Sequence, residues 1–219
     1  MRLIQRPSPN HDERTAPVDM LVLHYTGMVS AEAALERLCD PAAKVSAHYT
    51  IDEDGTVYAH VPENSRAWHA GVSHWAGVDN VNARSIGIEL VNPGHEFGYR
   101  AFPDAQIAAL IELAHDIFTR HTIPPSCVLG HSDVAPARKD DPGELFPWER
   151  LAREKIGLWP HGPAGEAPVE ALADYGYDAC APQDKVVTAF QRHFRPAKLD
   201  GVWDRECAEK LASLLRQLD

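Results

Sequence analysis

The stretch VDMLVLHYT, residues 18–26, contains an apolar run that ends at His24. A short, continuous apolar run of this kind predicts a buried β-strand inside a sheet that is covered on both faces. The histidine stands at the end of this strand, where side chains project from a rigid scaffold into a cleft. His24 is therefore either a metal ligand or a histidine that caps the core.

Further strands and helices are predicted around this strand. The segment SIGIELV, residues 85–91, alternates, so that Ile86, Ile88 and Leu90 share one face of a second strand. The other predicted elements are a helix at 31–39 with Ser30 as its N-cap, a hairpin within 46–62, a helix from 104 to about 121, a short strand at 127–131 and a short helix at 147–157.

The last part of the chain has a different character. The segment PHGPAGEAP, at 160–168, has the composition of a linker, and three helical patterns follow it. We expect an α+β fold with a mixed central β-sheet flanked by helices, plus a small all-α three-helix C-terminal domain. The predicted parts are an N-terminal arm at 1–17, a first domain at 18–160, a linker at 161–167 and a helical domain at 168–219.

The composition restricts the partners and the compartment. A net charge of −11 over 219 residues argues against a general affinity for nucleic acid or anionic membranes. The four cysteines form no C-x-x-C pair, which indicates reduced thiols rather than a cysteine metal site. We see no apolar run long enough for a secretory signal or a membrane span, so we expect a cytoplasmic protein. If a leader has been removed, a periplasmic protein or an outer-membrane lipoprotein is the alternative.

The segment GHSDVAPARKDDPG, residues 130–143, concentrates ionisable side chains in one irregular loop. His131 follows a short strand, and Pro142 biases Asp141 toward an extended conformation. In an extended loop, Lys139 and Asp141 point to one side. A cation beside a metal-binding carboxylate is costly unless it has its own anionic target, such as charge that develops on a substrate. A solvated loop of salt bridges is the alternative.

A site built from these residues has a definite chemistry. Two neutral imidazoles and one carboxylate leave Zn²⁺ with a net charge of +1 and an open fourth position, as in catalytic rather than structural zinc sites. Water in that position acidifies and needs a base. Glu89 shares its strand face with small neighbours and is the natural base, because its apolar flanks indicate a buried strand rather than an exposed edge.

Five strings closely resemble one enzyme family over residues 18–160. They are LVLHYT, VSAHYTIDEDGTVYAHVPE, RAWHAGVS, SIGIELVN and GHSDVAPARKDDPG, and the last is highly specific. The family is the zinc-dependent N-acetylmuramoyl-L-alanine amidases of the amidase-2 type, which includes AmpD- and AmiD-like enzymes and is related to peptidoglycan recognition proteins. The resemblance implies hydrolysis of the amide between N-acetylmuramic acid, 1,6-anhydro forms included, and L-alanine in peptidoglycan recycling or turnover.

The resemblance also implies roles for individual residues. His24, His131 and Asp141 match the three zinc ligands, Glu89 matches the base, and Lys139 matches the group that stabilises the tetrahedral intermediate. The family's substrate groove implies contacts for the residues His69, Trp68 and Asn92, with core packing as the alternative interpretation of Trp68.

The C-terminal helices resemble the three-helix peptidoglycan-binding domain of wall hydrolases, through AFQRHF and the D-G-x-x-D pattern at 200–204. Such a module supplies affinity rather than chemistry. The expected partners are peptidoglycan fragments or muropeptides, and the expected oligomeric state is a monomer. The alternatives are a protein of the same fold that recognises wall fragments without cutting them, and a zinc hydrolase that acts on another amide.

Overall fold

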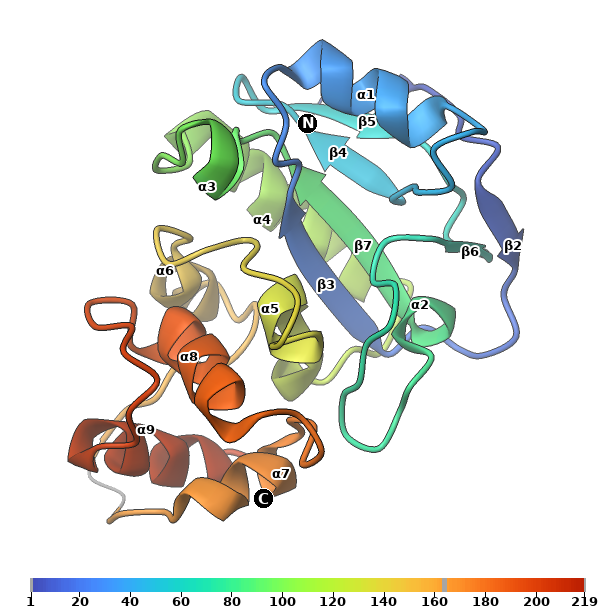
Figure 1. Ribbon diagram of the computed structural model, residues 1–219. Helices are drawn as coiled ribbons and strands as arrows, with labels where there is room; N and C mark the ends of the chain where they lie inside the picture. The colour runs from blue at the N-terminus through green and yellow to red at the C-terminus, as the bar shows by residue number, and fades with distance from the viewer. Residues whose placement is uncertain (1, 163–164, 219) are drawn as a thin grey trace.

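The computed structural model describes residues 2–162 and 165–218. Its centre is a six-stranded mixed sheet in the order β1-β5-β4-β7-β3-β8, and β2 pairs with β6 in a separate two-stranded sheet (Figure 1). The strands are β1 (Arg2–Gln5), β2 (His11–Glu13), β3 (Met20–Tyr25), β4 (Tyr49–Ile51), β5 (Thr56–Ala59), β6 (Ser65–Ala67), β7 (Ser85–Leu90) and β8 (Val128–Gly130).

Helices lie around this sheet, and the last ones gather at one end of the molecule (Figure 1). The helices are α1 (Ala31–Cys39), α2 (Val81–Arg84), α3 (Gly94–Phe97), α4 (Asp104–Phe118), α5 (His131–Val134), α6 (Trp148–Arg153), α7 (Leu172–Tyr175), α8 (Gln183–Phe194) and α9 (Arg205–Leu215), with 3-10 turns at Pro125–Cys127 and Val169–Ala171. Among the described residues, each helix is too short or too polar to cross a lipid bilayer.

Strand β3 divides two apolar cores between its faces. Leu21 and Leu23 point into a core that β7 and the apolar side of α4 complete. Met20 and Val22 point the opposite way, into a core that also contains Phe190 of α8. Both faces are therefore covered, as the continuous apolar run predicts, and the alternation carries His24 onto the second face.

The register of the parallel strands sets the positions of polar side chains. In the ladder between β3 and β7, His24 lies opposite Glu89. In the ladder between β3 and β8, Leu23 lies opposite Gly130, so His131 follows at the level of His24. Adjacent strands in register present these residues on one face, about 4.8 Å apart from strand to strand.

The structure confirms the predicted α+β class with a mixed central sheet. The predicted cap of α1 is present, since the Ser30 hydroxyl accepts a hydrogen bond of 3.2 Å from the amide of Ala33. Strands β4 and β5 form the predicted antiparallel hairpin. The segment predicted as an arm contributes more than expected, because Arg2–Gln5 pairs in parallel with Thr56–Ala59 at the sheet edge.

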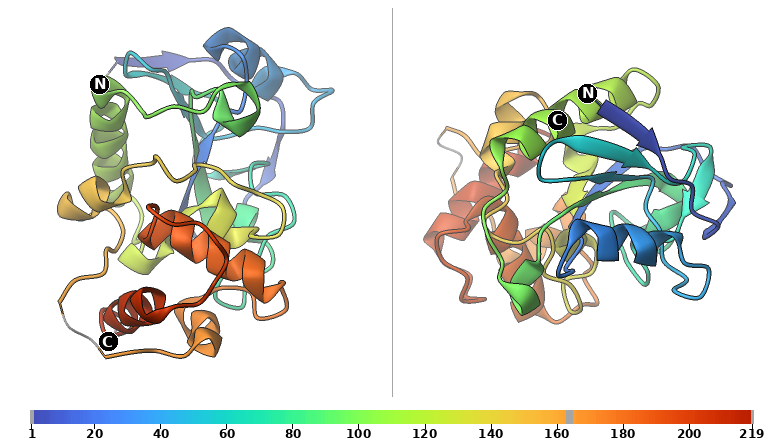
Figure 2. Two further views of the ribbon diagram at one scale, coloured as in Figure 1. Left: turned by 60° about the vertical axis from the view of Figure 1, so that its left-hand side comes forward. Right: turned by 90° about the horizontal axis from the view of Figure 1, so that it is seen from above.

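The C-terminal helices pack against the rest of the chain rather than standing apart. Helix α8 lies beside α5 in Figures 1 and 2. Trp75 contributes to the shared core with its ring in edge contact with Tyr177, at 4.9 Å between centroids. The predicted division at 161–167 stays a proposal, and residues 163 and 164 of that linker lie outside the described residues.

Candidate active site

Three side chains converge where β3 and β8 end, and we call them the ligand cluster: His24, His131 and Asp141. The Nδ1 atoms of the two histidines are 3.0 Å apart, and each is 3.0 Å from Oδ2 of Asp141. All three residues are buried, with exposed fractions of 1%, 4% and 6%. These atoms are close enough together to hold one metal ion.

The hydrogen bond of His131 fixes which of its ring nitrogens carries the proton. Its Nε2 lies 3.0 Å from the carbonyl oxygen of Ala70. A carbonyl oxygen only accepts, so Nε2 donates and Nδ1 of the neutral ring keeps its lone pair. That lone pair points into the ligand cluster, as a metal ligand requires.

A longer chain of contacts fixes the proton of His24. The hydroxyl of Ser85 donates to the carbonyl of Val81 over 2.7 Å and therefore accepts from Nε2 of His69 over 3.1 Å. His69 then accepts at Nδ1 from Nε2 of His24, over 3.0 Å. The direction of every bond is set by the carbonyl at the end, and Nδ1 of His24 keeps its lone pair.

Electrostatics favour the neutral form of His24. Burial, with a contribution from His131, lowers the pKa of His24 to about 4, so its imidazole is neutral near pH 7. Two neutral imidazoles and one carboxylate are a donor set that fits a zinc ion.

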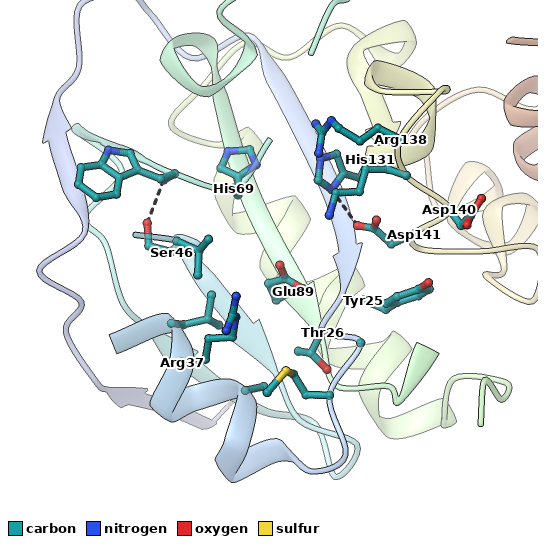
Figure 3. A pocket seen from close by; sticks show the side chains of 17 residues that line it. Tyr25, Thr26, Arg37, Ser46, His69, Glu89, His131, Arg138, Asp140 and Asp141 are labelled. Carbon is teal, nitrogen blue, oxygen red and sulfur yellow. Dashed lines mark hydrogen bonds and ion pairs between the residues drawn. The ribbon is translucent and has the colours of Figure 1, made fainter. Parts of the chain in front are cut away.

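Glu89 lies inside a cavity of about 370 Å³ that opens beside the ligand cluster. Figure 3 shows it between His131 and Asp141 on one side and Arg37 on the other. Its Oε2 atom is buried and has no hydrogen-bond partner among the described residues. Burial, followed by the charge of Asp141, raises the pKa of Glu89 well above its ordinary value. A carboxyl in this state can exchange a proton with a substrate.

The loop that carries Lys139 is folded differently from the expected extended path. It begins with the helical turn of α5, and the amides of Arg138 and Lys139 then donate to the carbonyl of Ala135. Lys139 and Asp141 both line the cavity, but Arg138 and Asp140, which an extended chain would turn to the other side, line it too. The loop departs from an extended path because buried apolar side chains such as Val134 pack α5 against the core.

The three residues expected in the substrate groove lie in different surroundings. Trp68 is half-buried, lines the cavity and donates from its indole nitrogen to Asp12 over 2.7 Å. His69 also lines the cavity, but both ring nitrogens are occupied by His24 and Ser85. Its ring lies against Gly87, where a Cβ atom would come within 2.4 Å of it.

Asn92 does not reach the cavity. It is fully buried, donates from Nδ2 to the carbonyl of Arg100 over 2.7 Å and accepts at Oδ1 from the amide of Gly94 over 3.0 Å. These contacts satisfy the side chain within its own loop. Asn92 therefore shapes the turn after β7, and its contact with substrate stays a prediction.

Two further residues, Arg138 and Ser85, support the site but were not predicted from the sequence. Arg138 donates to the carbonyls of Ala70 and Val72, over 2.8 and 2.6 Å, and so holds the irregular segment whose Ala70 carbonyl accepts from His131. Ser85 ends the proton chain behind His24. The alternation of β7 places Ser85 on the same face as Glu89, and this was the signal that could have singled it out.

A family model described as N-acetylmuramoyl-L-alanine amidase, Amidase-2, matches residues 14–144. The chain belongs to this family. The amidase AmiD of Escherichia coli K12 is 40% identical over 91% of this chain and 83% of its own length. The 1,6-anhydro-N-acetylmuramyl-L-alanine amidase AmpD of Haemophilus influenzae is 35% identical over 67% of this chain and 88% of its own length.

Solved structures of amidases share the fold. AmiD from E. coli, in complex with anhydro-N-acetylmuramic acid-L-Ala-D-gamma-Glu-L-Lys, superposes with a TM-score of 0.81 at 37% identity, over 94% of this chain and 92% of that one. AmpDh3 from Pseudomonas aeruginosa, in complex with anhydromuramic pentapeptide, gives a TM-score of 0.83 at 34% identity, over 96% and 95%. Both matches extend through the C-terminal helices, whereas the match to AmpD covers about two thirds of this chain.

Proposed function

We propose that this amidase hydrolyses the amide between the lactyl group of N-acetylmuramic acid and L-alanine, with zinc as its metal. The observation that supports this most directly is the convergence of two imidazole lone pairs and one carboxylate within 3.0 Å, next to a buried carboxyl. Membership of the amidase family supports the choice of substrate. The anhydro-muramyl substrate in the AmiD complex supports including the 1,6-anhydro forms.

The chain's own residues divide the work of hydrolysis. Zinc, when bound, acidifies a water molecule and polarises the carbonyl. Glu89 takes a proton from the attacking water at its carboxylate and returns it to the nitrogen of the leaving L-alanine. Lys139 stabilises the negative charge that develops on the carbonyl oxygen. His69 and the carbonyl of Ala70 orient the two imidazoles.

A muropeptide assay beside elemental analysis tests the proposal. Purified protein is analysed for zinc and incubated with a soluble anhydro-muropeptide, and the products are separated by chromatography and identified by mass. We expect about one zinc per chain and release of a free peptide that begins with L-alanine. Binding without cleavage supports the alternative of a non-catalytic recognition protein, and cleavage of a different amide supports the second alternative.

We also propose a wall-binding role, a location, an oligomeric state and partners for this protein. The helical part at 168–219 is proposed to contribute affinity for wall polymer, which a sacculus pull-down measures. The predicted cytoplasmic location is tested by cell fractionation, and the predicted monomer by light scattering. Muropeptides are the proposed partners, because the AmiD and AmpDh3 complexes contain anhydro-muramyl peptides.

A further inference from the structure

We propose that helix α8 positions the segment that carries two of the ligands, by holding it near both His131 and Asp141. The inference rests on the proposed metal site. It assigns to the C-terminal helices a task other than binding wall polymer, since two adjacent residues of α8, Arg192 and His193, each hold one end of the segment 131–141.

The first contact of α8 with this segment lies within a group that we call the anchor cluster: Asp133, Tyr177 and His193. Asp133 belongs to α5, two residues beyond His131, and is 1% exposed. Its carboxylate accepts from Nδ1 of His193, from the hydroxyl of Tyr177 and from the amide of Gly130, each over 2.7 Å. A carboxylate with three donors at this distance is tightly placed.

The packing around His193 leaves its ring little freedom. It stacks on Trp148 at 3.7 Å between centroids and on Phe194 at 3.9 Å. The ring is 3% exposed, so the whole arrangement is buried between α5, α6 and α8. The first turn of the ligand-bearing segment therefore cannot shift without moving α8.

The second contact of α8 with the segment lies at its C-terminal end, beside Asp141. Arg192 reaches Asp140, the neighbour of Asp141, over 2.8 Å. The arginine side chain is 10% exposed, and its Nε also lies 3.8 Å from a carboxylate oxygen of Glu144, three residues beyond Asp141. Because these two partners lie on either side of Asp141 in the chain, the arginine limits the movement of the backbone that carries this ligand.

The fold supplies a matched control on the same helix end. Arg195 is buried like Arg192, at 3% exposed, and pairs with Asp204 over 2.7 Å. Asp204 lies within the C-terminal part and caps α9. Replacing Arg195 therefore disturbs the helices through the same chemistry, without touching the segment 131–141.

The experiment compares Arg192→Gln and His193→Gln with Arg195→Gln. For each full-length protein, zinc affinity is measured by chelator competition, the cobalt-substituted form by its visible spectrum, and kcat and KM on a soluble muropeptide. We expect zinc affinity to fall about 10- to 100-fold in the first two variants, with a changed cobalt spectrum and a lower kcat at similar KM. Arg195→Gln keeps the wild-type affinity, spectrum and kcat, although it melts at a lower temperature.

Two results would overturn the inference. One is wild-type zinc affinity and kcat in folded Arg192→Gln and His193→Gln. The other is an equal loss of affinity in Arg195→Gln, which would make the effect one of general stability. If His193→Gln does not fold, Arg192→Gln decides, with Arg192→Lys as the variant expected to recover part of the affinity. Failure of the wild-type protein to bind zinc would instead refute the proposed function.

Discussion

The ligand cluster and the anchor cluster are both buried groups that contain histidine and aspartate, and one member of each, His131 and Asp133, lies in the short helix α5. In the anchor cluster, the carboxylate of Asp133 is surrounded by donors. In the ligand cluster, the lone pairs of His24 and His131 face Asp141 at 3.0 Å, because the protons of both rings are used elsewhere. A buried group with matched donors and acceptors is complete, whereas converging acceptors need a cation.

The substitution Asp141→Asn tests the difference between the two clusters most directly. Loss of a ligand removes zinc, so we expect amidase activity to fall at least about 1000-fold, because water activation and charge stabilisation disappear together. In zinc-free protein at pH 8, the free energy of unfolding changes by less than about 1 kcal/mol, because the new amide can donate to a histidine lone pair. Zinc analysis, muropeptide turnover and urea unfolding measure these effects. A large loss of zinc-free stability would show that the ligand cluster is complete without metal.

Lys139→Ala tests the cation beside the ligand cluster. We expect zinc to stay bound while kcat falls about 100- to 1000-fold, the usual effect of removing one donor to a developing oxyanion. Elemental analysis and turnover of a soluble muropeptide check both parts. Lys185→Ala, on the exposed side of α8, is the matched control with unchanged kcat. Near-normal turnover in Lys139→Ala would refute the role.

Asp133→Asn is the counterpart in the anchor cluster. An amide places its own donor against either Tyr177, which donates to Oδ1, or His193, which donates to Oδ2, so we expect the free energy of unfolding to fall by about 3 kcal/mol, with or without zinc. Urea unfolding of the zinc-free protein is the measurement. An unchanged midpoint would contradict the view that this cluster contributes to stability on its own.

His69→Gln tests the link between the ligand cluster and its satisfied surroundings. The substitution disrupts the chain that ends at Ser85, so His24 is free to take the wrong tautomer. We expect zinc affinity to drop about 10- to 100-fold, read by chelator competition. If His69 acts only on substrate, zinc affinity will stay the same and KM alone will rise.

Glu63 offers a smaller test on a half-buried carboxylate that does not line the cavity. Burial opposes its ionisation, but hydrogen bonds from Arg120, Tyr49 and His121 outweigh it and lower the pKa to about 2. Since this lies below the unfolded value near 4.5, the carboxylate stabilises the fold above about pH 4.5, and the effect disappears as the pH falls toward 2. Glu63→Gln should cost about 1–2 kcal/mol at pH 7.

The pH dependence of unfolding gives the measurement. The difference in unfolding free energy between wild type and Glu63→Gln should shrink steadily from pH 5 to pH 3. A difference that stays constant over this range would show that the glutamate contributes by shape rather than by charge.

The sequence was most informative where local pattern and burial agree. The apolar run of β3 and the alternation of β7 predict two central strands, and the residues at their ends include His24 and Glu89. The resemblance to the amidase family, now confirmed, singled out the two histidines of the ligand cluster from twelve. These features depend on the sequence close to each residue.

Features that depend on distant partners were not predictable in the same way. Strand β1 is short and mostly exposed, and its pairing with β5 identifies it as a strand. The use of both nitrogens of His69 depends on Ser85, a residue of another element. The hydrogen bond between His193 of α8 and Asp133 of α5 joins residues 60 positions apart. No periodicity within either segment predicts such a contact.

The pairing of His24 with Glu89 across two parallel strands has a practical consequence for anyone who would redesign this enzyme. The backbone positions of the proposed metal-binding imidazole and the proposed acid–base group are separated by the rung spacing of a sheet, about 4.8 Å, which backbone amides set. A designer can therefore relocate the base only by whole strands, and any exchanged loop has to keep Lys139 and Asp141 at the cavity. Shifting it one position along β7 would turn it to the opposite side of the molecule.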